Sequence, residues 1–241
     1  MNKEFERQEL LFGKEAMQKL REARVALFGV GGVGSYAAEA LARSGVGYIM
    51  LVDDDAVSPS NINRQLCALH STVGRPKVDV VAERLLDINP SLIIEKRQEF
   101  VLPENINSFS LDSFDYVIDA IDTVSAKLAI AEVCNAHSVP LISSMGTGNK
   151  QDPTALKVTD ITKTNTCPLA RVMRRELKKR GISHLRVVYS EEEAMTPLEH
   201  ITTDNGKTVV GSLAFVPSVA GLIVAGEAVK HLIAKGECGN G

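Results

Sequence analysis

The sequence predicts an α/β fold: a Rossmann-like, doubly wound and mostly parallel sheet with an elaborated C-terminal half. Two observations lead to this prediction. In the first half of the chain, short apolar runs alternate with helical patterns, which is typical of a parallel sheet covered by helices. After about residue 145 the alternation weakens, although no clean linker interrupts the chain. We therefore expect one domain made of two halves, residues 1–145 and 146–241.

The first half contains five apolar runs that we expect to be strands. A run of glycine and other small residues follows the first of them and is expected to continue as a helix. Pro76 opens a later helix, because proline fits the first helical turn, and Asn89-Pro90 ends it. The expected strands are 25–30, 48–52, one starting at 92–94, 116–120 and 141–142, and the expected helices are 31–44, 76–88 and 125–138.

The second half is expected to carry loops, short strands and two helices. Residues 146–166 are rich in Gly, Thr, Asn and Lys, which indicates crossing loops and short strands. Pro168 begins a strongly basic helix, and residues 186–189 follow as a strand. Three acids from Glu191 onward open an expected mobile loop that reaches to about Lys207.

Residues 209–226 carry no charge and allow two interpretations. The stretch is 18 residues long, the lower limit for a membrane-spanning helix. Pro217 interrupts it, however, and Glu227 and Lys230 follow on the helix that Pro217 opens. We therefore expect a buried strand over 209–216 and then a buried helix, rather than a membrane segment.

Composition places the chain among soluble cytoplasmic proteins. With 44% hydrophobic residues, the 241-residue chain can bury one substantial core. Its first residues are charged and precede no apolar run, so we expect no secretory signal. The four cysteines are scattered without a CxxC pair, which argues against a disulfide framework or a four-thiolate zinc site. The net charge of −3 excludes attraction of nucleic acid by the whole surface, but not by a local basic patch.

A glycine-rich loop between the first strand and its helix predicts a nucleotide-phosphate site. Glycines let the backbone approach phosphate oxygens, and the helix N-terminus offers free N–H groups. Asp53 ends the next strand, where a carboxylate accepts hydrogen bonds from ribose hydroxyls. On these features alone a dinucleotide-dependent dehydrogenase fits equally well. The loop glycines are Gly29, Gly31, Gly32 and Gly34.

Polar residues beyond Asp53 favour ATP over a nicotinamide cofactor. Asn61 and Arg64 lie in a polar cluster just after the strand end, and arginine makes paired contacts to phosphate oxygens. Lys77 lies in the first turn of the next helix, where the helix dipole disfavours a cation. A bound polyphosphate explains a lysine there, whereas the alternative is a merely solvated side chain.

The sequence resembles the ThiF and MoeB adenylyl-transferring superfamily over nearly the whole chain. The motifs that carry the resemblance are, in order, GxGGxG, an Asp at a strand end, SNxxRQ and GxxK. The resemblance implies that ATP lies over Gly32, with Asp53 at the ribose and Asn61, Arg64 and Lys77 at the triphosphate. It also implies a homodimer, in which Arg7 enters the ATP site of the neighbouring subunit.

The same resemblance gives Asp122 a role in binding Mg²⁺ or orienting the α-phosphate. Thr123 follows it where activators of sulfur-carrier proteins usually have Asn, so the second position differs from the family pattern. These implied roles make Arg7, Arg64, Lys77 and Asp122 the candidate catalytic residues. Asp122 is the candidate metal ligand, and the implied cofactors are ATP and Mg²⁺.

Within the superfamily, the branch that the chain resembles most is the tRNA threonylcarbamoyladenosine dehydratases. The matching stretches include Asp119-Ala120-Ile121-Asp122, Asp152-Pro153-Thr154 and Pro168-Leu169-Ala170. The resemblance implies that residues 1–145 bind nucleotide, and that 146–241 face substrate and form the dimer. It also implies an ATP-dependent cyclisation in tRNA, in which a threonine carboxylate is adenylated and the neighbouring carbamoyl group closes on it.

The basic helix from Pro168 is a candidate surface for tRNA phosphates. A charge run is more often a solvated helical face, but the resemblance favours nucleic-acid binding. Cys167, just before Pro168, is expected to be an ordinary partly buried cysteine, with a catalytic or sulfur-accepting role as the alternative. The candidate tRNA-binding residues are Arg171, Arg174, Arg175, Lys178 and Lys179.

Two other functions remain open at this point. One is activation of a sulfur-carrier or ubiquitin-like protein, against which the missing CxxC zinc pairs count. The other is a nucleotide-binding interaction module that partners a cysteine desulfurase. The three functions can be separated by what stimulates ATP turnover. The tRNA-modifying enzyme requires tRNA, the activating enzyme requires a carrier protein, and the interaction module responds to neither.

Overall fold

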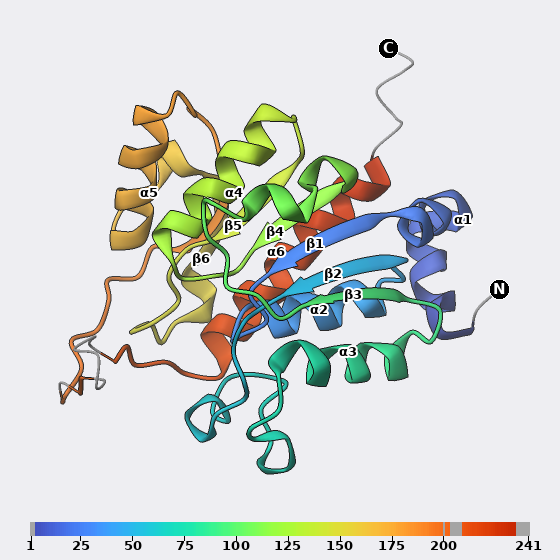
Figure 1. The fold of residues 1–241 in the computed structure, drawn as a ribbon, viewed down its shortest axis with the longest axis horizontal. Coiled ribbons are helices and arrows are strands. Elements are labelled where there is room, and N and C mark those ends of the chain that lie inside the picture. Colours follow the sequence, from blue (N-terminus) through green and yellow to red (C-terminus); the bar gives the residue numbers. More distant parts are fainter. Residues whose placement is uncertain (1–2, 200, 203–208, 235–241) are drawn as a thin grey trace.

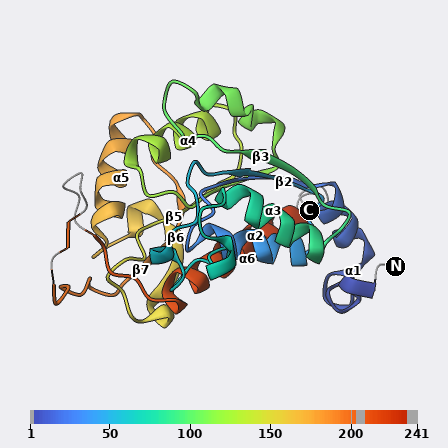
Figure 2. The same cartoon turned by 60° about the horizontal axis from the view of Figure 1, so that its bottom comes forward.

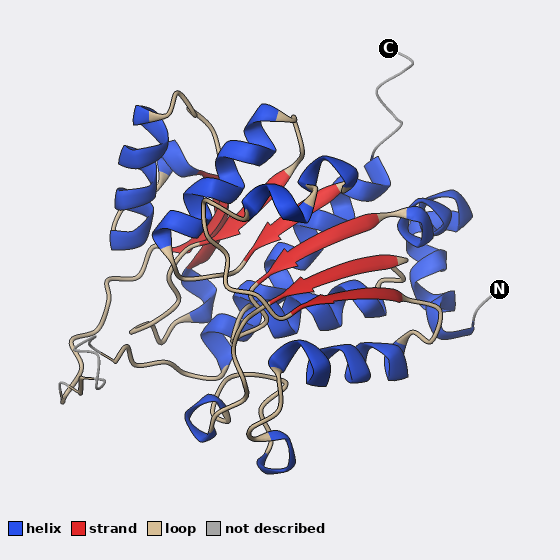
Figure 3. Cartoon of the chain, viewed as in Figure 1, coloured by secondary structure: helices blue, strands red, loops and turns tan. Residues whose placement is uncertain are grey.

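A seven-stranded sheet with the order β3-β2-β1-β4-β5-β7-β6 organises the chain (Figures 1 and 3). The computed structural model describes residues 3–199, 201–202 and 209–234. Five pairs of neighbouring strands are parallel, and β6 pairs antiparallel with β7 at one edge. The strands are β1 (Arg24–Phe28), β2 (Tyr48–Val52), β3 (Ile93–Arg97), β4 (Tyr116–Asp119), β5 (Leu141–Ser144), β6 (Leu156–Asp160) and β7 (Arg186–Ser190).

Helices cover both faces of this sheet, as the doubly wound pattern predicts. Helices α2, α3 and α6 lie on one face and α4 and α5 on the other, while α1 lies beside the amino ends of the strands (Figures 1 and 2). The helices are α1 (Glu6–Glu22), α2 (Gly34–Arg43), α3 (Lys77–Ile88), α4 (Val124–Ala136), α5 (Pro168–Lys179) and α6 (Phe215–Ala234).

The apolar runs of the central strands serve two cores, because alternate side chains point to opposite faces. In β1, Val25 and Leu27 pack into the core under α2 and α6, whereas Ala26 and Phe28 pack into the core under α4. All four side chains are fully buried. Continuous apolar runs are therefore required here, since both faces of a parallel sheet are covered.

The C-terminal region differs from the prediction in one element. No strand forms over the described residues 209–216; Val209 and Val210 are 43% and 57% exposed. The expected strand is therefore wrong. Residues 209–214 form a loop, in which the Asn149 amide donates to the Gly211 carbonyl and the Gly211 amide donates to the Asn149 side-chain oxygen Oδ1. Part of the expected loop before it, residues 200 and 203–208, lies outside the described residues.

Helix α6 begins at Phe215, two residues earlier than Pro217 predicts. Among the described helices it alone is long and apolar enough to cross a membrane by length and composition. In the structure, Val216, Ala220, Val224 and Ala228 are buried in the core shared with α2. The expected buried helix is thus confirmed.

Candidate nucleotide-binding site

A cleft of about 350 Å³ opens at the carboxyl ends of β1 and β4, where the strand order reverses. Doubly wound sheets bind ligands at this switch point. Most of the sequence-predicted nucleotide residues line this cleft: Gly29, Gly31, Gly32, Asp53, Asn61, Arg64, Lys77 and Asp122.

The glycine loop needs glycine for two separate reasons. Gly29 adopts φ +84°, a conformation that side chains rarely adopt, and a Cβ there would lie 2.8 Å from the carbonyl oxygen of Ala120. At Gly34, the first residue of α2, a Cβ would lie 1.7 Å from the carbonyl oxygen of Gly29. The tight turn therefore ends at Gly34, and α2 begins three residues later than expected. Gly31, Gly32 and Val33, which directly precede α2, line the cleft, so the N-terminus of the helix lies beside it, as in other anion sites.

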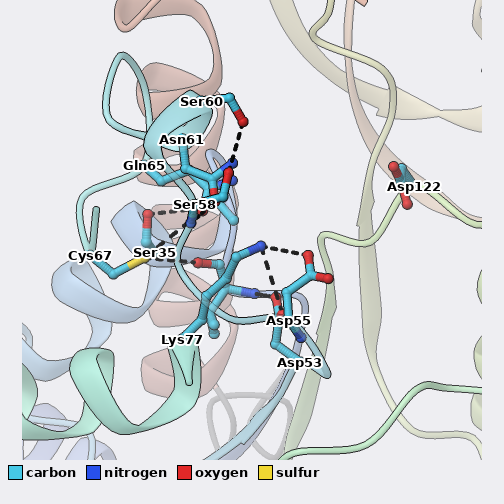
Figure 4. A network of polar contacts seen from close by, with 12 residues as sticks. Ser35, Asp53, Asp55, Ser58, Ser60, Asn61, Gln65, Cys67, Lys77 and Asp122 are labelled. Atoms are coloured by element: carbon cyan, nitrogen blue, oxygen red, sulfur yellow. Dashed lines mark hydrogen bonds and ion pairs between the residues drawn. The ribbon is translucent and has the colours of Figure 1, made fainter. Parts of the chain in front are cut away.

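Asp53 and Lys77 form a buried polar cluster beside the glycine loop (Figure 4). Asp53 Oδ2 accepts a hydrogen bond from the Val30 amide at 2.8 Å, which ties the strand end to the loop. Lys77 is 4% exposed; its Nζ lies 2.6 Å from Asp55 Oδ2 and 3.9 Å from Asp53 Oδ1. A merely solvated Lys77 is therefore excluded. Burial raises the pKa of Asp53, and the nearby Lys77 charge and the Val30 amide oppose this rise.

Asn61 and Arg64 are held by the short turn that follows β2. Asn61 Oδ1 accepts from the Ser58 amide at 3.1 Å, which caps the turn at Pro59–Asn61. Arg64 Nη1 donates to the carbonyl of Ser60 and to Asn63 Oδ1, both at 2.8 Å. The guanidinium has five N–H donors, so it keeps others for a ligand in the cleft.

Asp122 lies on the other side of the cleft, apart from the Lys77 cluster (Figure 4). It is exposed, and its carboxylate has one described contact, the Thr123 hydroxyl at 3.5 Å. The described residues contain no group of three or more metal-ligating side chains. One free carboxylate suits Mg²⁺, which is usually held by one or two carboxylates together with substrate phosphates.

Several cleft residues were not predicted from the sequence. Glu99, Phe100 and Val101 line it beyond β3, while Thr147 and Ser212 bring in the second half of the chain. The Asn63 side chain donates to the Ser212 carbonyl at 2.9 Å, so it joins the two halves at the cleft rather than facing a phosphate. No sequence signal identifies these residues, since they come together only through the crossing of loops.

Arg7 lies outside the cleft of its own chain. It is exposed on α1 and lines a separate, largely apolar hollow between α1 and α6. Leu11 from α1 and Leu222 from α6 also line this hollow and are 82% and 49% exposed. Any contact between Arg7 and the cleft must therefore come from another copy of the chain.

The basic residues of α5 differ in what they contact. Arg171 and Lys178 are exposed, and they make no ion pair with any described residue. Arg175, Lys179 and Arg180 surround Glu176, and the hydrogen bonds from Lys179 and Arg175 lower the pKa of Glu176 to about 2.

Two residues near the start of α5 point inward. Arg174 Nη1 donates to the Thr164 carbonyl and hydroxyl at 2.7 and 2.6 Å. Its guanidinium is thus occupied within the protein, unlike the exposed cations of the helix. Cys167 is 2% exposed, more buried than expected.

The fold and the cleft define an α/β protein of the Rossmann-like class with a nucleotide-type phosphate loop. The chain matches the ThiF family over residues 5–240. It is 47% identical over 240 residues to the tRNA threonylcarbamoyladenosine dehydratase of Bacillus subtilis, covering 95% of this chain and 94% of that protein. The same-named protein of Escherichia coli is 36% identical over 245 residues, covering 93% and 91%.

A solved structure gives the same result. The crystal structure of E. coli tRNA N6-threonylcarbamoyladenosine dehydratase, TcdA, in complex with ATP matches with a TM-score of 0.89 at 36% identity. The match covers 98% of this chain and 96% of that one. The chain therefore belongs to the ThiF family, and the Rossmann-like fold predicted from the sequence is confirmed.

Proposed function

We propose that this protein is an ATP-dependent enzyme that dehydrates threonylcarbamoyladenosine in tRNA to a cyclic product. The observation that carries the proposal is the cleft at the β1–β4 switch point, with Arg64 and Lys77 on one side and the free carboxylate of Asp122 on the other. Whole-length similarity to dehydratases, one of them solved with ATP, supports this function over activation of a carrier protein.

ATP fits the cleft with its phosphates at the glycine loop. The loop N–H groups and the N-terminus of α2 bind phosphate oxygens, and the Asp53 carboxylate accepts from the ribose hydroxyls. Asn61, Arg64 and Lys77 neutralise and orient the triphosphate. Asp122 would hold Mg²⁺, and the bound ion would offset negative charge on the phosphates.

The reaction needs no protein nucleophile. The threonine carboxylate attacks the α-phosphate of ATP, giving an acyl-adenylate and pyrophosphate. The carbamoyl group then attacks the activated carbonyl, expels AMP and closes the ring, so the side chain loses one water overall. Because ring closure is intramolecular, the protein mainly fixes geometry and neutralises charge. Cys167, which is 2% exposed, has no part in this mechanism.

We further propose that the enzyme is a cytoplasmic homodimer in which Arg7 completes the partner's ATP site. The exposed Leu10 and Leu11 on α1, beside the hollow that α6 lines, form an apolar surface suited to a second copy. The exposed cations of α5 contact tRNA phosphates, and no sulfur-accepting partner is required by the chemistry. One domain formed by the two halves is consistent with the single sheet that both supply.

Incubation with ATP and bulk tRNA, followed by mass analysis of the nucleosides, tests the proposal. We expect threonylcarbamoyladenosine to lose the mass of one water, with formation of AMP and pyrophosphate. Arg64→Ala serves as the inactive control. ATP consumption that responds only to a small carrier protein, with unchanged nucleosides, would overturn the proposal.

A further inference from the structure

A buried charged network lies at the carboxyl ends of β4 and β5, next to the turn that carries Asp122. Asp119, the last residue of β4, and Lys127, in α4, are each 1% exposed, and Ser143 of β5 is fully buried. Lys127 Nζ lies 2.8 Å from Asp119 Oδ2, 3.1 Å from Ser143 Oγ and 2.9 Å from the Ser144 carbonyl. Ser143 Oγ donates to the same Asp119 oxygen at 2.5 Å. The network therefore joins β4, α4 and β5.

Stability alone does not explain this network. Apolar residues of similar size often replace a buried ion pair without loss of stability, so a buried pair is weak evidence for a stabilising role. The surroundings favour apolar residues, because Ala126, Ala129 and Ile130 of the same helix are all buried.

The network contacts the turn that carries Asp122 through Asp119. Asp119 Oδ1 accepts from the Ile121 amide at 3.3 Å, one residue before Asp122. On the other side of Asp122, the Thr123 carbonyl accepts from the Lys127 backbone amide at 3.0 Å, which is the first backbone hydrogen bond of α4 and does not depend on the lysine side chain. The Asp122 side chain has no described partner except the Thr123 hydroxyl, so its direction depends on this turn.

The same network also reaches the loop on the substrate side of the cleft. Lys127 binds the Ser144 carbonyl, at the end of β5, and Thr147 lines the cleft three residues later. The ammonium group of Lys127 thus helps to position two segments that border the cleft: the turn after β4 and the loop after β5.

We propose that Lys127, with Asp119 and Ser143, is a positioning residue that fixes Asp122 for nucleotide binding and for reaction with the substrate. The proposal rests on the role of Asp122 in the proposed function. Lys127 does not touch the reacting atoms; it acts through the turn at Asp122. Outer partners of this kind change metal affinity or activity by about 10–100-fold when mutated.

A double-mutant cycle with Asp122→Asn and Lys127→Met tests this. The readouts are kcat and KM for ATP in the tRNA reaction, and the binding of a non-hydrolysable ATP analogue with and without Mg²⁺. In the parent protein, Mg²⁺ should strengthen binding of the ATP analogue, and we expect each single variant to lose this gain. In the presence of Mg²⁺, Lys127→Met should bind the analogue about 10–100-fold more weakly than the parent protein does. If Lys127 acts through Asp122, the double variant is no weaker than Asp122→Asn alone.

Losses that multiply in the double variant, or Lys127→Met with normal Mg²⁺-dependent binding, would overturn the inference. The inference would also be overturned if Lys127→Met lost Mg²⁺-dependent binding of the analogue while Asp122→Asn kept it. Analogue binding does not require the tRNA product. A failure of the proposed function, seen as no dehydration by the parent enzyme, is therefore distinguishable from a failure of this inference.

Two further variants separate positioning from folding. Ser143→Ala keeps both charges and removes only the hydroxyl between them, so we expect it to fold and to weaken Mg²⁺-dependent binding less than Lys127→Met does. Ile130→Ala, on the same helix and fully buried, removes apolar volume without touching the network. We expect it to lower the melting temperature and leave Mg²⁺-dependent binding unchanged. An equal binding loss in Ile130→Ala would show that any core damage suffices and would contradict the proposal.

Discussion

The phosphate-binding cleft and helix α5 both carry cationic side chains, but they hold them in opposite ways. In the cleft, Lys77 is 4% exposed and ion-paired to Asp55, and Arg64 is fixed by two hydrogen bonds. On α5, Arg171 and Lys178 extend into solvent. The first region has its charges in place before a ligand arrives, whereas the second can adjust to one.

This difference indicates two kinds of recognition. Fixed charges in a sheltered cleft stabilise a defined phosphate geometry strongly, since no reorganisation is needed on binding. Mobile surface cations bind a polyanion through release of counterions, so their contribution is individually small and falls with salt. Substitutions in the two regions should therefore differ in the size of their effect and in its dependence on salt.

Removing the cleft lysine is expected to cause the largest loss. Lys77→Met leaves Asp53 and Asp55 without their cation and removes a charge from the triphosphate site. We expect kcat/KM for ATP to fall about 100- to 1,000-fold, as for other fixed charge-stabilising groups. Steady-state kinetics of AMP formation measures this. Lys96→Met, which removes an exposed lysine paired to Asp79, is the matched control. If both variants lose activity equally, the site assignment is wrong.

Arg174 is the residue of α5 that should behave as a structural group. Arg174→Met removes the hydrogen bonds to Thr164 and leaves its carbonyl without this donor. We expect a loss of about 1–3 kcal/mol in the free energy of unfolding, measured by urea titration. The salt dependence of tRNA binding should not change. A shallower salt slope at unchanged stability would instead class Arg174 with the exposed cations.

The exposed cations of α5 should affect tRNA affinity alone. We expect Lys178→Glu to weaken tRNA binding several-fold and to make the slope of log K against log salt less steep by about one. Binding of the ATP analogue should remain normal. Lys96→Glu, on β3, changes the charge equally at another surface. Equal weakening by the two variants would mean that total charge matters and that α5 is no binding surface.

Glu176 should give the smallest effect, and one that depends on pH. Hydrogen bonds from Lys179 and Arg175 lower its pKa to about 2 in the folded protein, below its ordinary value of 4.5. A depressed folded pKa stabilises the fold above the unfolded pKa, and this stability is lost as pH falls from about 4.5 to about 2. We expect Glu176→Gln to melt slightly below the parent protein at pH 7 and level with it near pH 2. A constant gap at both pH values would contradict this.

Much of the cleft could be predicted because its residues follow strand ends. Parallel strands bring their carboxyl ends to one edge, so Gly29, Asp53 and Asp122 had to lie near one another. Lys77 could be placed because Pro76 marks the start of its helix. The positions of these residues at strand and helix ends therefore predict where they lie in the site.

The rest depends on tertiary contacts that no local pattern encodes. The bonds among Asp119, Lys127 and Ser143 join three elements, although a lysine within an apolar helix was a usable signal. The apolar residues 209–216 resemble a strand, but β6 already occupies the edge next to β7; residues 209–214 instead form a loop, and α6 begins at Phe215. Arg174 points inward because its guanidinium donates to the carbonyl and hydroxyl of Thr164, which lies in a turn before α5.

In the proposed reaction, a carboxylate on tRNA attacks the α-phosphate of ATP in this cleft. The reaction can be carried out on tRNA whose threonylcarbamoyladenosine carboxylate contains oxygen-18, followed by mass analysis of the AMP released. Because ring closure expels AMP together with one carboxylate oxygen, we predict one labelled oxygen atom in AMP for each cyclic nucleoside formed. Unlabelled AMP alongside a dehydrated nucleoside would contradict the acyl-adenylate route.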